Sequence, residues 1–184
     1  MDAFEQLVAQ ILWMDGYWVQ TSVKVNLTKE DKEAIQRPSS PRWEIDVVGY
    51  SGRDNLLRIV ECKSYLDSTG VRFKSFCDEN STEMQRYKLF ADVNLRNIVF
   101  NRLKLQLAGS GACRQDTKVE LCLACGKIAS DSDREQLHIH FRQNGWELLD
   151  EKWLRERLRK MSEGSYENQV AAVVSKLLLR GKVD

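Results

Sequence analysis

Two short apolar segments with acidic residues embedded in them constrain the fold of this chain most. Residues 43–50 and 56–65 are rich in Val, Ile and Leu and are separated by Ser51-Gly52-Arg53-Asp54-Asn55. Apolar β-branched residues favour strands, and a short segment of Gly, Asn, Asp and Ser between two strands favours a hairpin turn. The sequence therefore predicts an antiparallel hairpin that carries Asp46 on its first strand and Glu61 on its second.

The remaining apolar patterns predict an alternation of helices and strands around this hairpin. Apolar residues at helical spacing indicate helices over 2–14, 82–107 (one bent helix or two), 132–144, 150–161 and 165–180. Strands are expected over 17–25, 118–125 and 146–149, with a helical turn after Thr28 in an exposed connection. The order predicts an α/β fold with a mixed central sheet flanked by helices and an extra C-terminal helix. Residues 1–162 are expected to form the main domain, and residues 163–184 a helical appendage after the break at Gly164.

Composition limits the setting in which such a domain works. The chain has 184 residues, of which 42% are hydrophobic, and 28 Lys and Arg against 27 Asp and Glu leave a net charge of +1, so any basic surface must be local. No apolar run approaches the ~20 residues that cross a bilayer, and the N-terminus has no signal-peptide pattern. Five cysteines do not suit a fully paired disulfide framework, so we expect a cytoplasmic protein with no membrane contact.

The hairpin brings together residues that suit metal chemistry. The two-residue period of a strand places Glu61 and Lys63 on one face and Cys62 on the other, with Asp46 on the neighbouring strand. Two carboxylates in apolar surroundings repel each other unless a cation joins them, and oxygen ligands favour Mg²⁺ or Mn²⁺. The backbone carbonyl of Cys62 would add a ligand, and Lys63 would orient or deprotonate a water. The alternative is an ion-pair cluster on a solvated sheet face.

These residues are similar to a known catalytic pattern. The opening helix Phe-Glu-Gln-Leu-Val-Ala-Gln-Ile-Leu, then Asp46, then Glu61-Cys62-Lys63, resembles the PD-(D/E)xK nuclease superfamily, with a restriction-endonuclease-like fold, and within it the Mrr-type enzymes and Holliday-junction resolvases. The resemblance covers about residues 1–65 and departs from the motif in having Ile45 before the Asp. It implies that Asp46 and Glu61 bind Mg²⁺, that Lys63 assists the attacking water, and that Glu5 completes the site. Glu5 is equally explained as a first-turn residue that the helix dipole favours.

Further polar residues are candidates for contacts to nucleic acid. Gln85 and Lys88 follow the hairpin and would contact phosphate, or else belong to a solvated helix face. Arg155 and Arg159 lie in the densest basic segment, which suits either a DNA backbone or an exposed amphipathic helix. Arg42 precedes the hairpin and is open to the same two interpretations.

The cysteines and histidines do not form a convincing metal motif. Cys122 and Cys125 lie in an apolar segment at a spacing that points them to opposite faces of a strand, so zinc binding with Cys113, His138 or His140 is not favoured. Buried, reduced thiols are the expectation for these cysteines, and for Cys62 and Cys77 as well.

The sequence thus predicts a Mg²⁺-dependent endonuclease that hydrolyses phosphodiester bonds in DNA, as a homodimer or within a larger defence or repair complex. The alternative is a non-catalytic DNA-binding or assembly subunit that keeps a nuclease-like scaffold. RNA as the substrate stays open, because the metal chemistry does not distinguish the two sugars.

Overall fold

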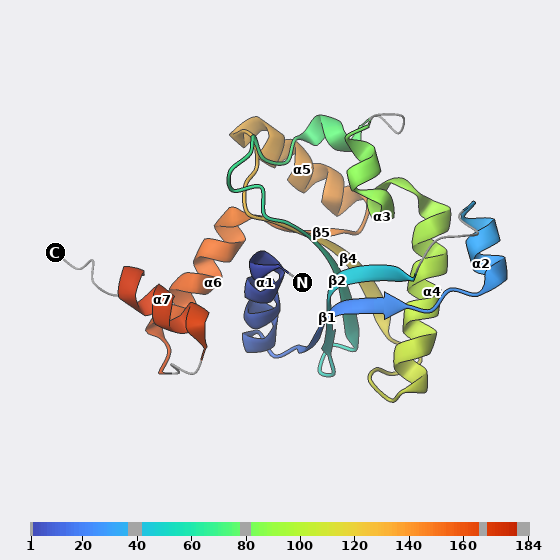
Figure 1. The fold of residues 1–184 in the computed structure, drawn as a ribbon. Coiled ribbons are helices and arrows are strands. Elements are labelled where there is room, and N and C mark those ends of the chain that lie inside the picture. Colours follow the sequence, from blue (N-terminus) through green and yellow to red (C-terminus); the bar gives the residue numbers. More distant parts are fainter. Residues whose placement is uncertain (1, 37–41, 78–81, 166–168, 180–184) are drawn as a thin grey trace.

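The central feature of the computed structural model is a five-stranded sheet in the order β1-β2-β3-β4-β5, with helices on both faces (Figure 1). The structure describes residues 2–36, 42–77, 82–165 and 169–179. Its strands are β1 (Trp18–Val25), β2 (Trp43–Ser51), β3 (Leu56–Lys63), β4 (Lys118–Cys125) and β5 (Glu147–Leu149). Strands β1 to β3 pair antiparallel, whereas β3 with β4 and β4 with β5 pair parallel. The expected mixed α/β sheet is confirmed, and its first three strands form an antiparallel meander.

Helices cover each face of the sheet and create two apolar cores. One core lies under α1 (Ala3–Met14) and α6 (Glu151–Glu163), and the other under α3 (Lys88–Ala91), α4 (Val93–Gly109) and α5 (Asp131–Gln143). Helix α2 (Lys29–Ala34) is capped by Thr28, and α7 (Val170–Leu179) packs on α6. Successive residues of β3 alternate between the cores, because side chains of a strand point to opposite faces: Ile59 enters the α4 side, and Val60 and Cys62 enter the α1 side.

Local chemistry explains where the first helix begins and ends. The Asp2 side chain accepts a hydrogen bond from the Glu5 N–H, and the Glu5 side chain accepts one from the Asp2 N–H, which together form a capping box. The helix ends at Met14 with Asp15 as its C-cap, and the next residue, Gly16, has a φ of +92°, a conformation that glycine adopts at little cost. The expected boundaries at both ends are confirmed.

The segment after the hairpin differs from the expectation of one bent helix or two over 82–107. It is divided into a 3₁₀ turn η2 (Met84–Arg86), α3 and α4. The Asp92 carboxylate accepts a hydrogen bond of 2.9 Å from the Leu95 N–H and so starts a new helix at that point. A further 3₁₀ turn, η1 (Phe73–Phe76), lies in a segment for which no helix was predicted.

The cysteines also divide in a way that the sequence only partly predicted. Cys122 lies in the α1-side core and Cys125 in the α4-side core, as expected for opposite faces of one strand, and Cys62 is buried. Cys77 is exposed, so the expectation of a buried thiol there is wrong. Within the described ranges, every helix is too short or too polar to cross a lipid bilayer.

Candidate functional site

The hairpin of β2 and β3 places two carboxylates next to each other. The ladder between these strands pairs Val47 with Val60, which puts Asp46 beside Glu61 in the next position. Asp46 Oδ2 accepts a hydrogen bond of 2.8 Å from the Cys62 N–H, so its carboxylate is fixed against the backbone of β3. The two acidic side chains that the sequence singled out therefore lie on adjacent strands at one point of the sheet.

A distortion in β1 accompanies this arrangement. Ser22 has a φ of +52°, a left-handed conformation that is uncommon for residues other than glycine. The pairs on either side, Thr21 with Val47 and Val23 with Ile45, put Ser22 opposite Asp46. Val47 packs into the α1-side core, whereas Ile45 packs into the α4-side core, although a regular strand would send both to one face. Both strands thus twist at Asp46, as strands do where an irregularity redirects a side chain.

Lys63 provides the positive charge nearest to Glu61. Its Nζ lies 3.0 Å from Glu61 Oε1, and the two side chains are 23% and 14% exposed. Burial raises the pKa of Glu61, and Asp46 raises it further, against the opposing effect of Lys63. Burial alone would lower the pKa of Lys63, but the attraction and the hydrogen bond of Glu61 raise it above its ordinary value. For Glu61, the effect of burial on the pKa therefore outweighs that of Lys63.

These three side chains line a pocket of about 290 Å³, which we call the Asp46–Glu61 pocket. Its other walls come from the start of β2 and from η2 and α3. Gln85 and Lys88, both predicted as nucleic-acid contacts, line it, and the charge of Lys88 acts on Glu61. The remaining polar and apolar lining residues are Trp43, Glu44, Ile45, Val60, Arg86 and Leu89.

Four other predicted site residues lie outside this pocket. Glu5 is not among its lining residues, and one of its carboxylate oxygens accepts the 3.1 Å hydrogen bond of the α1 capping box. Arg155 and Arg159 line a separate groove between α1, α6 and α7. Arg42 is exposed next to Trp43, one residue before β2 and the pocket wall.

The backbone behind Lys63 is held by a close approach of two chain segments. The Gly126 N–H donates a hydrogen bond of 3.1 Å to the Lys63 carbonyl. A Cβ atom at Gly126 would lie 2.3 Å from the Ser64 carbonyl oxygen, so only glycine fits there without displacing the chain. The end of β4 thus fixes the end of β3, from which Lys63 projects.

The residues of the pocket fit a divalent cation. Asp46 and Glu61 supply oxygen ligands, the type that Mg²⁺ and Mn²⁺ prefer, and burial raises the pKa of Glu61. Among the described residues, no group of three or more His, Cys, Asp and Glu side chains is arranged to hold a metal, so backbone and water oxygens would complete the coordination. No protein-family model, curated protein or solved structure matches this chain.

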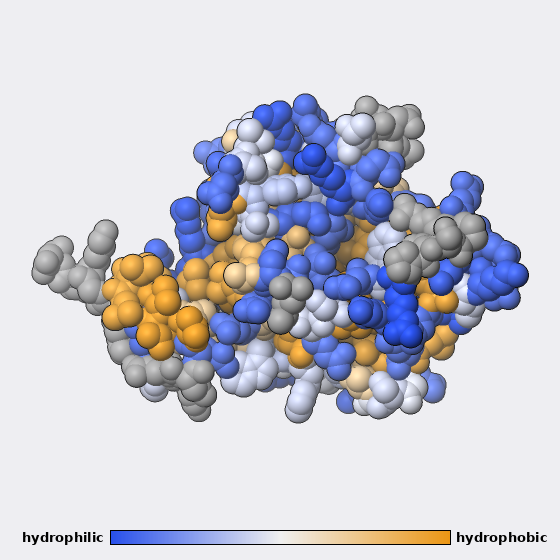
Figure 2. All heavy atoms as spheres, in the orientation of Figure 1, coloured by the Kyte–Doolittle hydropathy of each residue, from blue (hydrophilic) through white to orange (hydrophobic). Residues whose placement is uncertain are grey.

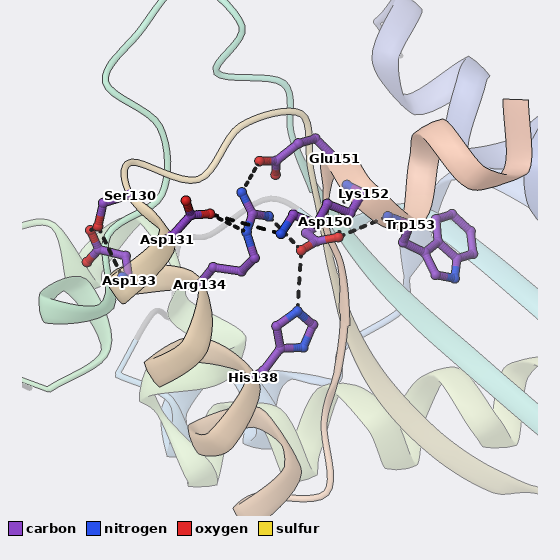
Figure 3. Close-up of polar contacts among 9 residues, drawn as sticks. All are labelled: Ser130, Asp131, Asp133, Arg134, His138, Asp150, Glu151, Lys152 and Trp153. Atoms are coloured by element: carbon purple, nitrogen blue, oxygen red, sulfur yellow. Dashed lines mark hydrogen bonds and ion pairs between the residues drawn. The ribbon is translucent and has the colours of Figure 1, made fainter. Parts of the chain in front are cut away.

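A second charged cluster, which the sequence did not predict, connects α5 with the start of α6 (Figure 3). Arg134 Nη1 donates a 2.7 Å hydrogen bond to Asp150 Oδ2, and Arg134 Nη2 donates to Glu151. His138 Nε2 lies 3.3 Å from the same Asp150 oxygen. The other oxygen, Asp150 Oδ1, accepts the N–H of Trp153 at 3.0 Å and caps α6. We call Arg134, His138, Asp150 and Glu151 the Arg134 network.

Proposed function

We propose that this protein is a Mg²⁺-dependent endonuclease with a restriction-endonuclease-like fold, acting on phosphodiester bonds in DNA. The observation that carries the proposal is the convergence of Asp46, Glu61 and Lys63 on one pocket. The mixed sheet, with α1 before it and the hairpin of β2 and β3 near its middle, is compatible with that fold. The resemblance over residues 1–65 supports the same assignment.

In this proposal Asp46 and Glu61 hold the cation, with the Cys62 carbonyl as a further oxygen. The 2.8 Å hydrogen bond from the Cys62 N–H keeps the Asp46 carboxylate in place before the cation binds. Bound Mg²⁺ would polarise the phosphoryl oxygen and lower the pKa of a coordinated water. Lys63 holds its ammonium 3.0 Å from Glu61, where it can orient the attacking water and stabilise charge on the phosphate.

The polar wall of the pocket is the proposed contact to the substrate backbone. Gln85 and Lys88 line the same hollow as the two carboxylates, and Arg86 lies between them. Amide and cationic side chains are common contacts to phosphate oxygens. Arg155 and Arg159, which line another groove, are assigned no role at the scissile phosphate.

A second candidate function is a DNA-binding or assembly subunit without catalysis. The ion pair of 3.0 Å between Lys63 and Glu61 favours it, because this pair partly neutralises Glu61 without any metal. The two candidates differ in what Mg²⁺ does, since only a nuclease requires the cation for product formation.

Incubation with supercoiled plasmid and Mg²⁺ or Mn²⁺ tests the proposal. We expect nicked or linear products from the wild-type chain and none from Asp46→Asn, which keeps an oxygen for the Cys62 N–H but removes the charge. Asp54→Asn, in the turn of the same hairpin, is the matched control and should cleave as the wild type does. Asp54 accepts a hydrogen bond from the Ser51 hydroxyl and does not line the pocket. Undiminished cleavage by Asp46→Asn would overturn the assignment, DNA binding without cleavage would favour the second candidate, and cleavage of RNA alone would change the substrate.

A further inference from the structure

Strand β1 is an edge of the sheet, and one side of its backbone pairs with no other strand among the described residues. The strand order places β1 outermost, next to β2 alone. In an edge strand, alternate residues direct their N–H and C=O groups away from the neighbouring strand. Apart from the ladder with β2, no hydrogen bond joins the backbone of residues 19–23 to another described residue. These groups are therefore available to a further strand.

A hollow runs along this free edge. It has a volume of about 640 Å³ and is lined by the consecutive residues 19–24, so it follows the backbone of β1 rather than one face of the sheet. Helix α1 contributes Ala9, Gln10 and Trp13 to one wall, and Gln106 of α4 lies in the other. In Figure 1, β1 lies between these two helices. Six strand residues span about 17–20 Å, the length of an average strand, so a short extended segment fits along the hollow.

One end of this edge already pairs with an amide group. The side-chain amide of Gln106 donates a hydrogen bond of 3.1 Å to the Lys24 carbonyl and accepts one of 3.1 Å from the Asn26 N–H. The backbone of an added strand would donate and accept hydrogen bonds in the same way. The outward groups of β1 therefore bond to an amide where one is within reach, and Gln106 occupies only the end of the edge after Val23.

An apolar surface alone does not define what covers it. The exposed Val and Leu side chains of α7, orange at the left of Figure 2, would pack against any apolar partner. The edge of β1 is more selective, because its N–H and C=O groups are directional and their spacing matches that of another extended backbone. A helix bonds its own backbone groups internally and offers few of them to such an edge.

The shape of the edge favours a separate peptide segment over the β1 strand of a second copy. Trp13 is 54% exposed in the wall beside the edge, and Gln106 closes one end of it. Two edges that each lie between side walls cannot approach to the ~4.8 Å of a strand pair. The φ of +52° at Ser22 also bends β1, and irregularities of this kind keep the edges of whole sheets from pairing.

We propose that β1 binds an extended peptide segment of another protein, which adds a strand to this edge of the sheet. The apolar side chains of the peptide face the wall of Ala9 and Trp13, and the alternate, polar side chains face Gln106. Lys24 is the one charged side chain among the described residues that line the hollow. A peptide with acidic residues is therefore favoured over a basic one.

Chemical-shift mapping on the full chain with the peptide acetyl-Glu-Val-Thr-Val-Thr-Val-Glu-amide tests the proposal. The three Val side chains share one face of this peptide when it is extended. We expect a dissociation constant below about 1 mM, with the largest backbone amide shifts in residues 19–24. The same peptide with methylated Val and Thr nitrogens keeps its side chains but loses these N–H donors. It should bind at least tenfold more weakly.

A substitution in the wall of the hollow provides a second test. Ala9→Tyr places a bulky uncharged side chain beside the edge and should weaken peptide binding at least tenfold. Gln6→Tyr is the matched control, because Gln6 is an exposed residue of the same helix that does not line the hollow. It should bind the peptide as the wild type does, and circular dichroism should show that both variants remain folded. The outcome is independent of the proposed nuclease activity, because the hollow shares no lining residue with the Asp46–Glu61 pocket.

Three results would overturn the proposal. The first is the absence of amide shifts in residues 19–24 at about 5 mM peptide, a concentration at which even weak binding is detected. The second is equal binding of the N-methylated peptide, or equal binding by Ala9→Tyr, which would show that the backbone edge is not the site. The third is a wild-type dimer in which hydrogen exchange of residues 19–24 slows on dimerisation, which would assign the edge to a second copy.

Discussion

The Asp46–Glu61 pocket and the Arg134 network are built from the same kinds of side chain, yet they differ in how their charges are compensated. In the network, burial alone would raise the pKa of Asp150, but the Trp153 N–H and Arg134 hold it below its ordinary value. In the pocket, burial raises the pKa of Glu61 despite Lys63. Both oxygens of Asp150 are hydrogen-bonded, although Glu151 Oε2 in the same network is buried without a hydrogen-bond partner. In the pocket, the carboxylate whose pKa is raised is Glu61.

This contrast separates a structural cluster from a candidate functional one. The side chain of Asp150 is only 4% exposed, and both of its oxygens accept hydrogen bonds from the chain. Asp46 and Glu61 instead line a hollow that a ligand can enter. Carboxylates with a raised pKa beside a hollow are the stronger indication of function.

Removing the cationic side chain from each cluster should have the largest effects on the free energy of unfolding, and these effects should differ most between the two clusters. Arg134→Met leaves Asp150 and Glu151 buried without their partner and should lower the free energy of unfolding by about 3–5 kcal/mol in urea titrations. Lys152→Met, whose lysine is 67% exposed, should cost less than about 0.5 kcal/mol. If Lys63→Met proves as destabilising as Arg134→Met, the pocket is a structural ion pair like the network.

Neutralising Glu61 should show the opposite pattern. Glu61→Gln should reduce plasmid cleavage by about 100-fold or more, equivalent to roughly 3 kcal/mol of transition-state stabilisation. The free energy of unfolding should change by less than about 1 kcal/mol, because the substitution removes a poorly compensated buried charge. Normal cleavage by a folded Glu61→Gln protein would remove Glu61 from the proposed site.

Magnesium should distinguish the two clusters without any change of sequence. At ten times its dissociation constant, Mg²⁺ should stabilise the wild-type fold by about 1.4 kcal/mol, measured as a shift in thermal unfolding. The shift should disappear in Asp46→Asn and persist in Arg134→Met. An equal shift in wild type and Asp46→Asn would place metal binding elsewhere.

Acid should act on the network with a predictable sign. Because the folded-state pKa of Asp150 lies below its unfolded value, this residue stabilises the fold above about pH 4 and loses that contribution as the pH falls through the lowered pKa. Asp150→Asn keeps a helix-capping oxygen but does not titrate. Between pH 5 and pH 2, the free energy of unfolding of Asp150→Asn should fall by about 1 kcal/mol less than that of the wild type. Parallel acid profiles would show that Asp150 does not carry this dependence.

The strands β2 and β3 and the approach of their carboxylates could be predicted from the sequence because both depend on residues that are close together in the chain. A short turn joins β2 and β3, so the register of one hairpin is enough to bring Asp46 beside Glu61. The sequence left one bent helix or two open over 82–107, and the position of the break at Asp92 was not predicted because apolar residues continue at helical spacing through Phe90. The capping box of Glu5 follows a readable pattern, an Asp followed three residues later by a Glu.

The Arg134 network could not be predicted in this way, and Gln85 and Lys88 were predicted as phosphate contacts but not as walls of this pocket. Arg134 and Asp150 approach each other only because α5 and β5 pack on the sheet, and neither residue belongs to a motif. Gln85 and Lys88 reach the pocket through η2 and α3, whose positions depend on packing against the α4-side core. Tertiary contacts of this kind carry no local signal.

The parallel pairing of β3 with β4 affects the order in which the structural elements can form during folding. The hairpin of β2 and β3 is local and can form rapidly, so the two carboxylates can meet early. The contact that fixes Lys63 from behind, through Gly126, requires a crossover that passes through η1, η2, α3 and α4 before β4 is reached. Closing so long a loop is slow, and we therefore expect refolding kinetics in which acidic residues are assembled well before the pocket around them is complete.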